Sequence, residues 1–309
     1  MASLNLENFE CQRVLNEDPQ THTVTLLGTL PPPPSSPESP RHLAIIRIEK
    51  TALPSFSDTL VSNTKLIEST DIYSWFFGWL RASENNPDVK INVICPATEV
   101  HIRKYSNQLV RIVKETPELY GRIVKPYIDA FPASRTKWVE NVICGRSESE
   151  KVVYKSPPDD PMGFLIIPDM KWDLATVSSL YLIAITLFKD IRSLRDLTKK
   201  HVSMLKNIRR QAHQAVKDRW GLEATELRLF VHYQPSYYHF HVHIVNANYS
   251  GLTGMAVGQA HMLDDIISLL EVDGSQETSI FQRMTLSYGL GEQHGLYVPM
   301  IAAQEEIAR

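Results

Sequence analysis

Four histidines lie close together between residues 232 and 243, and they are the residues of this chain best suited to chemistry. Three of them, His239, His241 and His243, alternate with apolar residues, and His232 lies shortly upstream. Successive side chains of a β-strand point to opposite faces, so a strand here places the three imidazoles on one face. Buried imidazoles need hydrogen-bond partners, and three neighbours compete for them, so packing alone explains this pattern poorly. The segment therefore predicts a chemical site.

Two kinds of chemistry use clustered imidazoles. Alternating imidazoles bind zinc or copper, but the adjoining hairpin contains no carboxylate or cysteine that would complete such a site. In phosphoryl transfer, a neutral imidazole attacks phosphorus while neighbouring imidazoles donate to the phosphoryl oxygens and protonate the leaving group. Phosphoryl transfer uses every histidine of the segment and is favoured, with a metal site as the alternative.

The strands and helices expected around these histidines indicate an α+β domain. The apolar runs at residues 164–167 and 180–185 have the length of buried strands. Apolar residues at intervals of three or four predict helices at residues 198–220 and 262–271, and Gly221 ends the first of them. Further strands are expected at residues 227–233, 238–245 and 283–288, the first two joined by a turn at residues 234–236.

The residues that precede this domain predict a smaller domain that contains a sheet. Strands are expected at residues 23–27, 43–48 and 91–95, and the proline run from residue 31 to 37 predicts an extended surface loop. A helix is expected from Thr98, its N-cap, towards Val113. We place the boundary between residues 107 and 108, which gives domains of residues 1–107 and 108–309.

Composition and charge narrow the classes of partner. A hydrophobic content of 43% suffices for substantial cores, and a net charge of -3 offers no basic surface for a long nucleic acid. No segment is typical of a signal peptide or of a membrane span. The three cysteines, Cys11, Cys95 and Cys144, lack the spacing of a disulfide framework and predict buried thiols in a reducing compartment. The expected location is the cytoplasm, the nucleus or both.

The histidine segment also resembles a known family. Residues 231–243, VHYQPSYYHFHVH, are similar to the scavenger mRNA decapping enzymes, which belong to the histidine-triad superfamily. Further similarity covers nearly the whole chain and includes PATE at 96–99, IPDMKW at 167–172, LYLIAI at 180–185 and IRSLRDL at 191–197.

The resemblance implies hydrolysis of m7GpppN cap dinucleotides and of the short capped RNA that remains after 3′-to-5′ mRNA decay. The implied products are 7-methyl-GMP and a nucleoside diphosphate, formed through a phosphohistidine at His241, with His239, His243 and His232 around the phosphates. It also implies a domain-swapped homodimer, in which the exchanged amino-terminal domain covers the carboxy-terminal histidine-triad domain. Neither a metal nor another cofactor is expected.

The resemblance further assigns residues that bind the substrate. Trp138 aligns with a tryptophan that stacks on the methylated base, and Met170 stands opposite that base. Because 7-methylguanine is cationic, an indole face attracts it beyond ordinary stacking. Carboxylates accept from guanine N–H groups and an ammonium donates to O6, the roles implied for Glu148, Asp169 and Lys171. The remaining expected contacts come from Tyr73, Lys104, Ser236 and Tyr237.

Two other functions fit the same residues. One is a regulatory paralogue that binds the cap with little or no turnover, against which the complete triad of histidines argues. The other is a hydrolase of ordinary dinucleoside polyphosphates without selectivity for the methyl group, and Trp138 with Glu148 discriminates against it. Comparing turnover of methylated and unmethylated cap dinucleotides separates the three functions.

Overall fold

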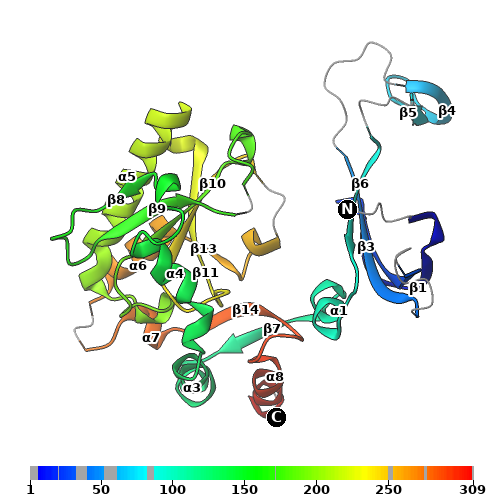
Figure 1. The fold of residues 1–309 in the computed structure, drawn as a ribbon. Coiled ribbons are helices and arrows are strands. Elements are labelled where there is room, and N and C mark those ends of the chain that lie inside the picture. The colour runs from blue at the N-terminus through cyan, green and yellow to red at the C-terminus, as the bar shows by residue number, and fades with distance from the viewer. Residues whose placement is uncertain are drawn as a thin grey trace. The chain divides into compact units, whose positions relative to one another are not determined.

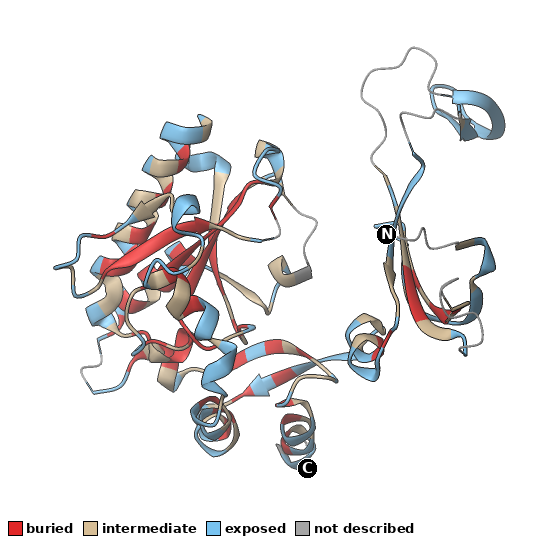
Figure 2. Ribbon diagram, viewed as in Figure 1, coloured by how far each residue is buried: buried red, intermediate tan, exposed pale blue. Residues whose placement is uncertain are grey.

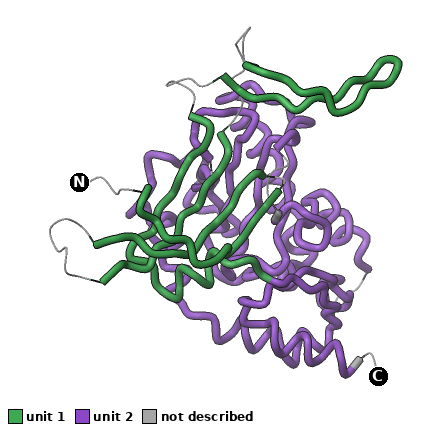
Figure 3. Tube along the Cα trace, turned by 90° about the vertical axis from the view of Figure 1, so that its right-hand side faces the viewer, with its two compact units in different colours: residues 1–108 green, residues 109–309 purple. Residues whose placement is uncertain are grey.

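The computed structural model describes residues 6–19, 21–32, 40–51, 61–81, 87–170, 172–249, 253–274 and 277–307. The chain divides into two compact units, residues 1–108 and 109–309, coloured separately in Figure 3. Most of the proline run lies outside the described residues. Within the described ranges, no helix is both long and apolar enough to span a membrane.

The first unit contains an antiparallel sheet with the strand order β1-β2-β3-β6 (Figure 1). Its strands are β1 (Glu10–Asp18), β2 (Thr23–Leu30), β3 (His42–Lys50) and β6 (Val89–Ile94). A small core forms between this sheet and helix α1 (Glu99–Tyr105), through Leu27, Ile45 and Ile102. Strands β4 (Val61–Ser69) and β5 (Ser74–Leu80) form a separate hairpin. The strands expected in this region are therefore present.

The helix expected from Thr98 towards Val113 was predicted too long. Thr98 does precede α1, and its backbone N–H donates to Nδ1 of His101 (3.1 Å). The helix ends at Tyr105, and strand β7 (Val110–Glu115) follows. The β-branched side chains in β7 suit a strand, and β7 pairs with β14 (Leu286–Gly291), far along the chain.

The second unit is built on a six-stranded antiparallel sheet with the order β13-β11-β12-β10-β9-β8. Its strands are β8 (Tyr154–Lys155), β9 (Phe164–Pro168), β10 (Tyr181–Thr186), β11 (Leu227–His232), β12 (His241–Asn246) and β13 (Ala260–Met262). The α-helices of this unit are α2 (Pro117–Leu119), α3 (Lys125–Asp129), α4 (Lys137–Ile143), α5 (Val202–Trp220), α6 (Leu263–Val272), α7 (Ile280–Arg283) and α8 (Tyr297–Ile307). The mixed α+β class with antiparallel sheets is confirmed.

The apolar runs read from the sequence form the centre of this sheet. All six residues of β10 are buried, and Figure 2 shows the central strands as buried along much of their length. Helix α5 has Gly221 after its last residue, in the left-handed conformation (φ 71°), as expected. The strand predicted at residues 283–288 begins later than expected, because Arg283 belongs to α7.

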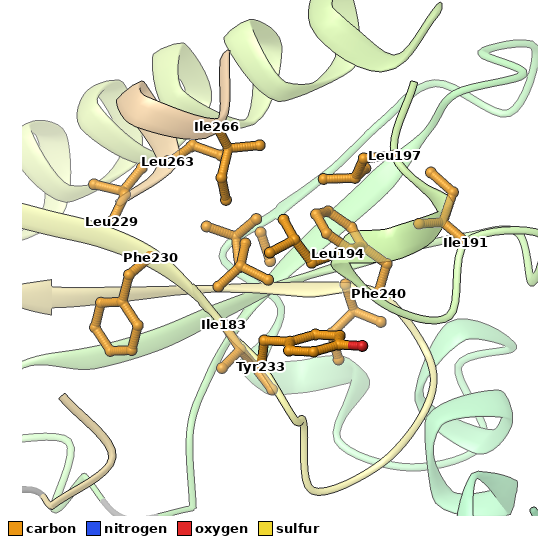
Figure 4. Close-up of a cluster of buried hydrophobic side chains, with 14 of the residues drawn as sticks. Ile183, Ile191, Leu194, Leu197, Leu229, Phe230, Tyr233, Phe240, Leu263 and Ile266 are labelled. Atoms are coloured by element: carbon orange, nitrogen blue, oxygen red, sulfur yellow. The ribbon is translucent and has the colours of Figure 1, made fainter. Parts of the chain in front are cut away.

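A continuous apolar core joins the sheet to its helices. Figure 4 shows Leu229 from β11 near Leu263 and Ile266 from α6, whereas Phe230 points to the other side of the strand. All four side chains are buried. This core holds β11 and β12 firmly, and these strands carry three of the four histidines.

The cysteines were expected to be buried thiols, and this expectation was wrong for two of them. Cys11 and Cys144 are exposed, and Cys95 is half-buried.

A buried ion pair braces the segment between β11 and β12. Glu115 and Arg195, both 0% exposed, lie 2.7 Å apart. The Glu115 carboxylate also accepts from the hydroxyls of Tyr233 (2.7 Å) and Tyr288 (2.6 Å) and from Nε2 of Gln234 (3.1 Å). Because buried charges are stable only when paired and hydrogen-bonded, this network ties the start of the segment to β7 and β14.

Candidate active site

The histidine strand begins three residues later than predicted. Strand β12 starts at His241, so it includes His241 and His243 but not His239. The reason is that the backbone N–H of Phe240 donates to the carbonyl of Ile191 (3.0 Å) rather than to a neighbouring strand. Both faces of β12 are buried, and each of the three histidines is only 4% exposed. The face that carries the imidazoles is therefore enclosed within the second unit.

His241 and His243 reach a cavity of about 340 Å³ in the second unit. Its lining comes from α4 and the segment after it, from β9 and the segment after it, from β10, β11 and β12, and from the turn between β11 and β12. The lining residues are Trp138, Val142, Glu148, Ile167, Pro168, Asp169, Met170, Ile183, His232, Ser236, Tyr237, His241 and His243. Nine of the residues predicted from the sequence are thus brought together.

The imidazoles of His232, His241 and His243 line the cavity together. The rings of His241 and His243 are edge to face, with centroids 4.9 Å apart, and His232 approaches His243 at 4.2 Å. Tyr237 stacks on His241 with centroids 4.2 Å apart and planes at 12°. The ring of His241 is therefore held on one side by an aromatic face.

Backbone carbonyls determine which nitrogens of two histidines carry protons. Nδ1 of His241 lies 2.8 Å from the carbonyl oxygen of His239. A carbonyl only accepts, so Nδ1 of His241 carries the proton and the neutral ring has its lone pair on Nε2. A lone pair on Nε2 makes His241 competent as a nucleophile.

His239 does not line the cavity. Its Nε2 donates to the carbonyl oxygen of Thr186 (2.7 Å), which directs the ring towards the end of β10. Burial lowers the pKa of His239, so the ring is held neutral. In this structure the carbonyl of His239 accepts from Nδ1 of His241. The ring of His239 is bound to the backbone of Thr186 and helps to hold this part of the chain in place.

The aromatic and acidic residues expected to recognise a base also line the cavity. Trp138 is 40% exposed and meets the ring of Tyr237 edge to face at 5.1 Å. Glu148 pairs with Lys151 (3.2 Å) at the surface, and Met170 is 96% exposed. An indole beside the carboxylates of Glu148 and Asp169 can stack on a purine and accept its N–H groups.

Besides His239, three predicted residues are not among those that line the cavity. Lys171 lies outside the described residues. Tyr73 lies in the turn between β4 and β5, stacked on Trp75 at 6.1 Å, and Lys104 lies in α1. Tyr73 and Lys104 belong to the first unit, and their roles remain predictions.

Sequence reasoning missed Tyr181. Its hydroxyl lies 2.8 Å from Nδ1 of His243. The available signal was a phenol in the otherwise apolar run at residues 180–185, because a buried hydroxyl requires a hydrogen-bond partner. Among the side chains that the structure describes, no group of three or more His, Cys, Asp or Glu is placed to hold a metal ion.

Two family models match the chain. The model described as "Scavenger mRNA decapping enzyme (DcpS) N-terminal" matches residues 4–108, and "Scavenger mRNA decapping enzyme C-term binding" matches residues 137–258. The m7GpppX diphosphatase of Schizosaccharomyces pombe is 37% identical over 305 residues, covering 96% of this chain and 95% of that protein. The human m7GpppX diphosphatase is 34% identical over 306 residues, covering 98% and 88%. That of Ascaris suum is 34% identical over 300 residues, covering 95% and 94%.

Proposed function

The chain belongs to the scavenger mRNA decapping enzyme family, and on this premise we propose that it is an m7GpppX diphosphatase. Its substrates are m7GpppN cap dinucleotides and short capped RNA, and its products are 7-methyl-GMP and a nucleoside diphosphate. The observation that carries the proposal is the 2.8 Å contact between Nδ1 of His241 and the carbonyl of His239, which leaves the lone pair on Nε2.

The proposed reaction has two steps. Nε2 of His241 attacks the phosphorus next to 7-methylguanosine, and the bond from that phosphorus to the bridging oxygen breaks. The nucleoside diphosphate leaves as its anion, to which a neighbouring imidazole donates a hydrogen bond; the ring of His243 lies 4.9 Å from that of His241. Water then attacks the phosphohistidine and loses a proton to the solvent as the bond from phosphorus to Nε2 breaks. This step releases 7-methyl-GMP and restores the neutral ring of His241.

Recognition of the methylated base is assigned to other residues that line the same cavity. Trp138 offers an indole face, which favours a cationic ring, and Glu148 and Asp169 accept the N–H groups of guanine. Lys171 is proposed to donate to O6. Together these groups distinguish 7-methylguanine from other bases by both charge and hydrogen bonding.

We further propose a homodimer in which the amino-terminal domains are exchanged. The β4–β5 hairpin is evidence for a partner, because an isolated two-stranded hairpin is at best marginally stable in water. Both strands expose large apolar side chains: Leu66, Ile67, Trp75, Phe76, Phe77 and Trp79. A second copy of this chain is the proposed partner, and Tyr73 and Lys104 are the proposed substrate contacts from this domain.

The test of the proposal is the variant His241→Asn. Asparagine occupies similar space but cannot form the phosphoramidate bond, so hydrolysis of m7GpppG is abolished while m7GpppG still binds. His213→Asn is the matched control, since His213 lies on α5 and outside the cavity lining, and it retains full activity. Substantial turnover by His241→Asn contradicts the assignment of the nucleophile.

Wild-type kinetics separate the two alternative functions. A regulatory paralogue binds m7GpppG without turnover, and a general dinucleoside polyphosphate hydrolase cleaves GpppG as efficiently as m7GpppG. The proposed enzyme cleaves m7GpppG with the higher kcat/KM.

A further inference from the structure

We propose that Tyr181 is a positioning residue that holds His243 as the tautomer protonated on Nε2. The inference rests on the proposed function, because it assigns His243 the part of a donor to the phosphates. Tyr181 is 1% exposed, and its hydroxyl oxygen lies 2.8 Å from Nδ1 of His243. Tyr181 is not among the residues expected to bind the cap or to catalyse the reaction.

The strand register explains why these two side chains meet. His243 of β12 pairs with Ile183 of β10, and Tyr181 lies two residues away on the same face of β10. Tyr181 is therefore the diagonal neighbour of His243, at a separation that a long aromatic side chain spans. The hydroxyl comes from a strand whose residues are all buried, so the contact is rigidly placed.

The direction of the hydrogen bond follows from the two groups. Burial, together with the nearby Asp169 carboxylate, raises the pKa of Tyr181, so the phenol keeps its proton. A phenol O–H is a stronger donor than the N–H of a neutral imidazole, and the imidazole lone pair is the better acceptor. The hydroxyl of Tyr181 therefore donates to Nδ1, and the neutral ring of His243 carries its proton on Nε2.

Aromatic neighbours fix the plane of the His243 ring. Phe230 stacks on it with centroids 5.1 Å apart and planes at 18°, and the Tyr181 ring meets it edge to face at 5.6 Å. His232 lies against it at 4.2 Å. With the ring plane held by packing, the Tyr181 hydroxyl decides which nitrogen is protonated.

The result is a pair of complementary imidazoles on one strand. His241 has its Nδ1 proton held by a carbonyl and offers a lone pair at Nε2, whereas His243 has Nδ1 as acceptor and offers a proton at Nε2. One ring is set to attack phosphorus and the next to donate to a phosphate oxygen. If the His243 proton moved to Nδ1, a lone pair would face the anionic phosphates instead.

The test is Tyr181→Phe in the full-length protein, which keeps the ring and removes the hydroxyl. Histidine labelled with ¹⁵N reports the tautomer of each ring without substrate, and His243→Asn identifies the His243 signals. In the wild type, His243 is expected with Nε2 protonated. In Tyr181→Phe its two nitrogens shift towards a mixture of tautomers, and kcat for m7GpppG falls on the order of tenfold with little change in KM. The control Tyr154→Phe removes a hydroxyl from β8 of the same sheet and changes neither quantity.

Two results overturn the inference. The first is a His243 protonated on Nδ1 in the wild type. The second is a Tyr181→Phe variant in which the tautomer is unchanged, even if kcat falls, because the loss is then merely structural. Failure of the proposed function is recognised separately, since turnover by His241→Asn contradicts it without altering the tautomer of His243.

Discussion

Replacing Glu115 by glutamine is expected to destabilise the second unit strongly. The carboxylate of Glu115 accepts from Arg195, Tyr233, Gln234 and Tyr288. An amide has one acceptor oxygen, so donors on one side of it face an N–H group and lose their partner. The side chain of Arg195, which is 0% exposed, then keeps its charge without a counter-charge.

The size of the loss in unfolding free energy follows from the burial of this ion pair. Removing one partner of a buried ion pair costs about 3–5 kcal/mol. Arg195 retains backbone carbonyls as acceptors, among them that of Met284 (2.7 Å), so we expect about 3 kcal/mol for Glu115→Gln, at the lower end of that range. With a urea m-value of about 2 kcal/mol/M, the midpoint falls by roughly 1.5 M.

The assay is urea unfolding followed by circular dichroism and by tryptophan fluorescence, since a chain of two units need not unfold in one transition. The matched control is Glu271→Gln, which breaks the exposed pair with Lys206 and is expected to cost less than about 1 kcal/mol. The double variant Glu115→Met with Arg195→Met is expected to be more stable than Glu115→Gln, because no unpaired charge remains buried. Equal shifts for Glu115→Gln and Glu271→Gln would refute this reasoning.

Two further predictions concern the cap and the pH. In a His241→Asn background, Trp138→Ala weakens binding of m7GpppG by on the order of 1–3 kcal/mol and binding of GpppG by clearly less, as calorimetry measures. Equal losses for the two ligands contradict methyl recognition by the indole. Burial lowers the pKa of His239, His261 and His294, so below about pH 6.5 the unfolded chain binds more protons than the folded one. The free energy of unfolding is therefore greatest above that pH and falls below it. Urea unfolding midpoints at pH 7.5 and 5.5 measure the difference. An unfolding midpoint that stays the same or rises on acidification argues against neutral buried histidine rings.

Local sequence was sufficient where the determining interactions are local. The runs that became β9, β10 and β11 were located to within two residues at each end, because strands in a buried sheet are continuously apolar. The family was recognised from strings around the histidines, and the family models and relatives confirm it. Helix α5 was located by its apolar repeat and by the glycine after it.

The errors arose where distant partners decide the structure. Residues 110–115 carry enough apolar side chains to continue a helix, but β14 supplies hydrogen bonds that make them a strand. Strand β12 begins at His241 because the carbonyl of Ile191, on another segment, takes the N–H of Phe240. Neither partner can be found from periodicity.

The sequence by itself determined the family, and imidazoles in such number and spacing favoured phosphoryl transfer over a metal site. The tertiary structure decided the part that individual groups play. It placed Trp138 and Glu148, about a hundred residues upstream, in the cavity with His241. It also set the acceptor at Nδ1 of His241 and the hydroxyl at Nδ1 of His243. Protonation of an imidazole depends on what lies opposite each nitrogen, and the neighbouring strand that supplies the Tyr181 hydroxyl is joined to β12 only by folding.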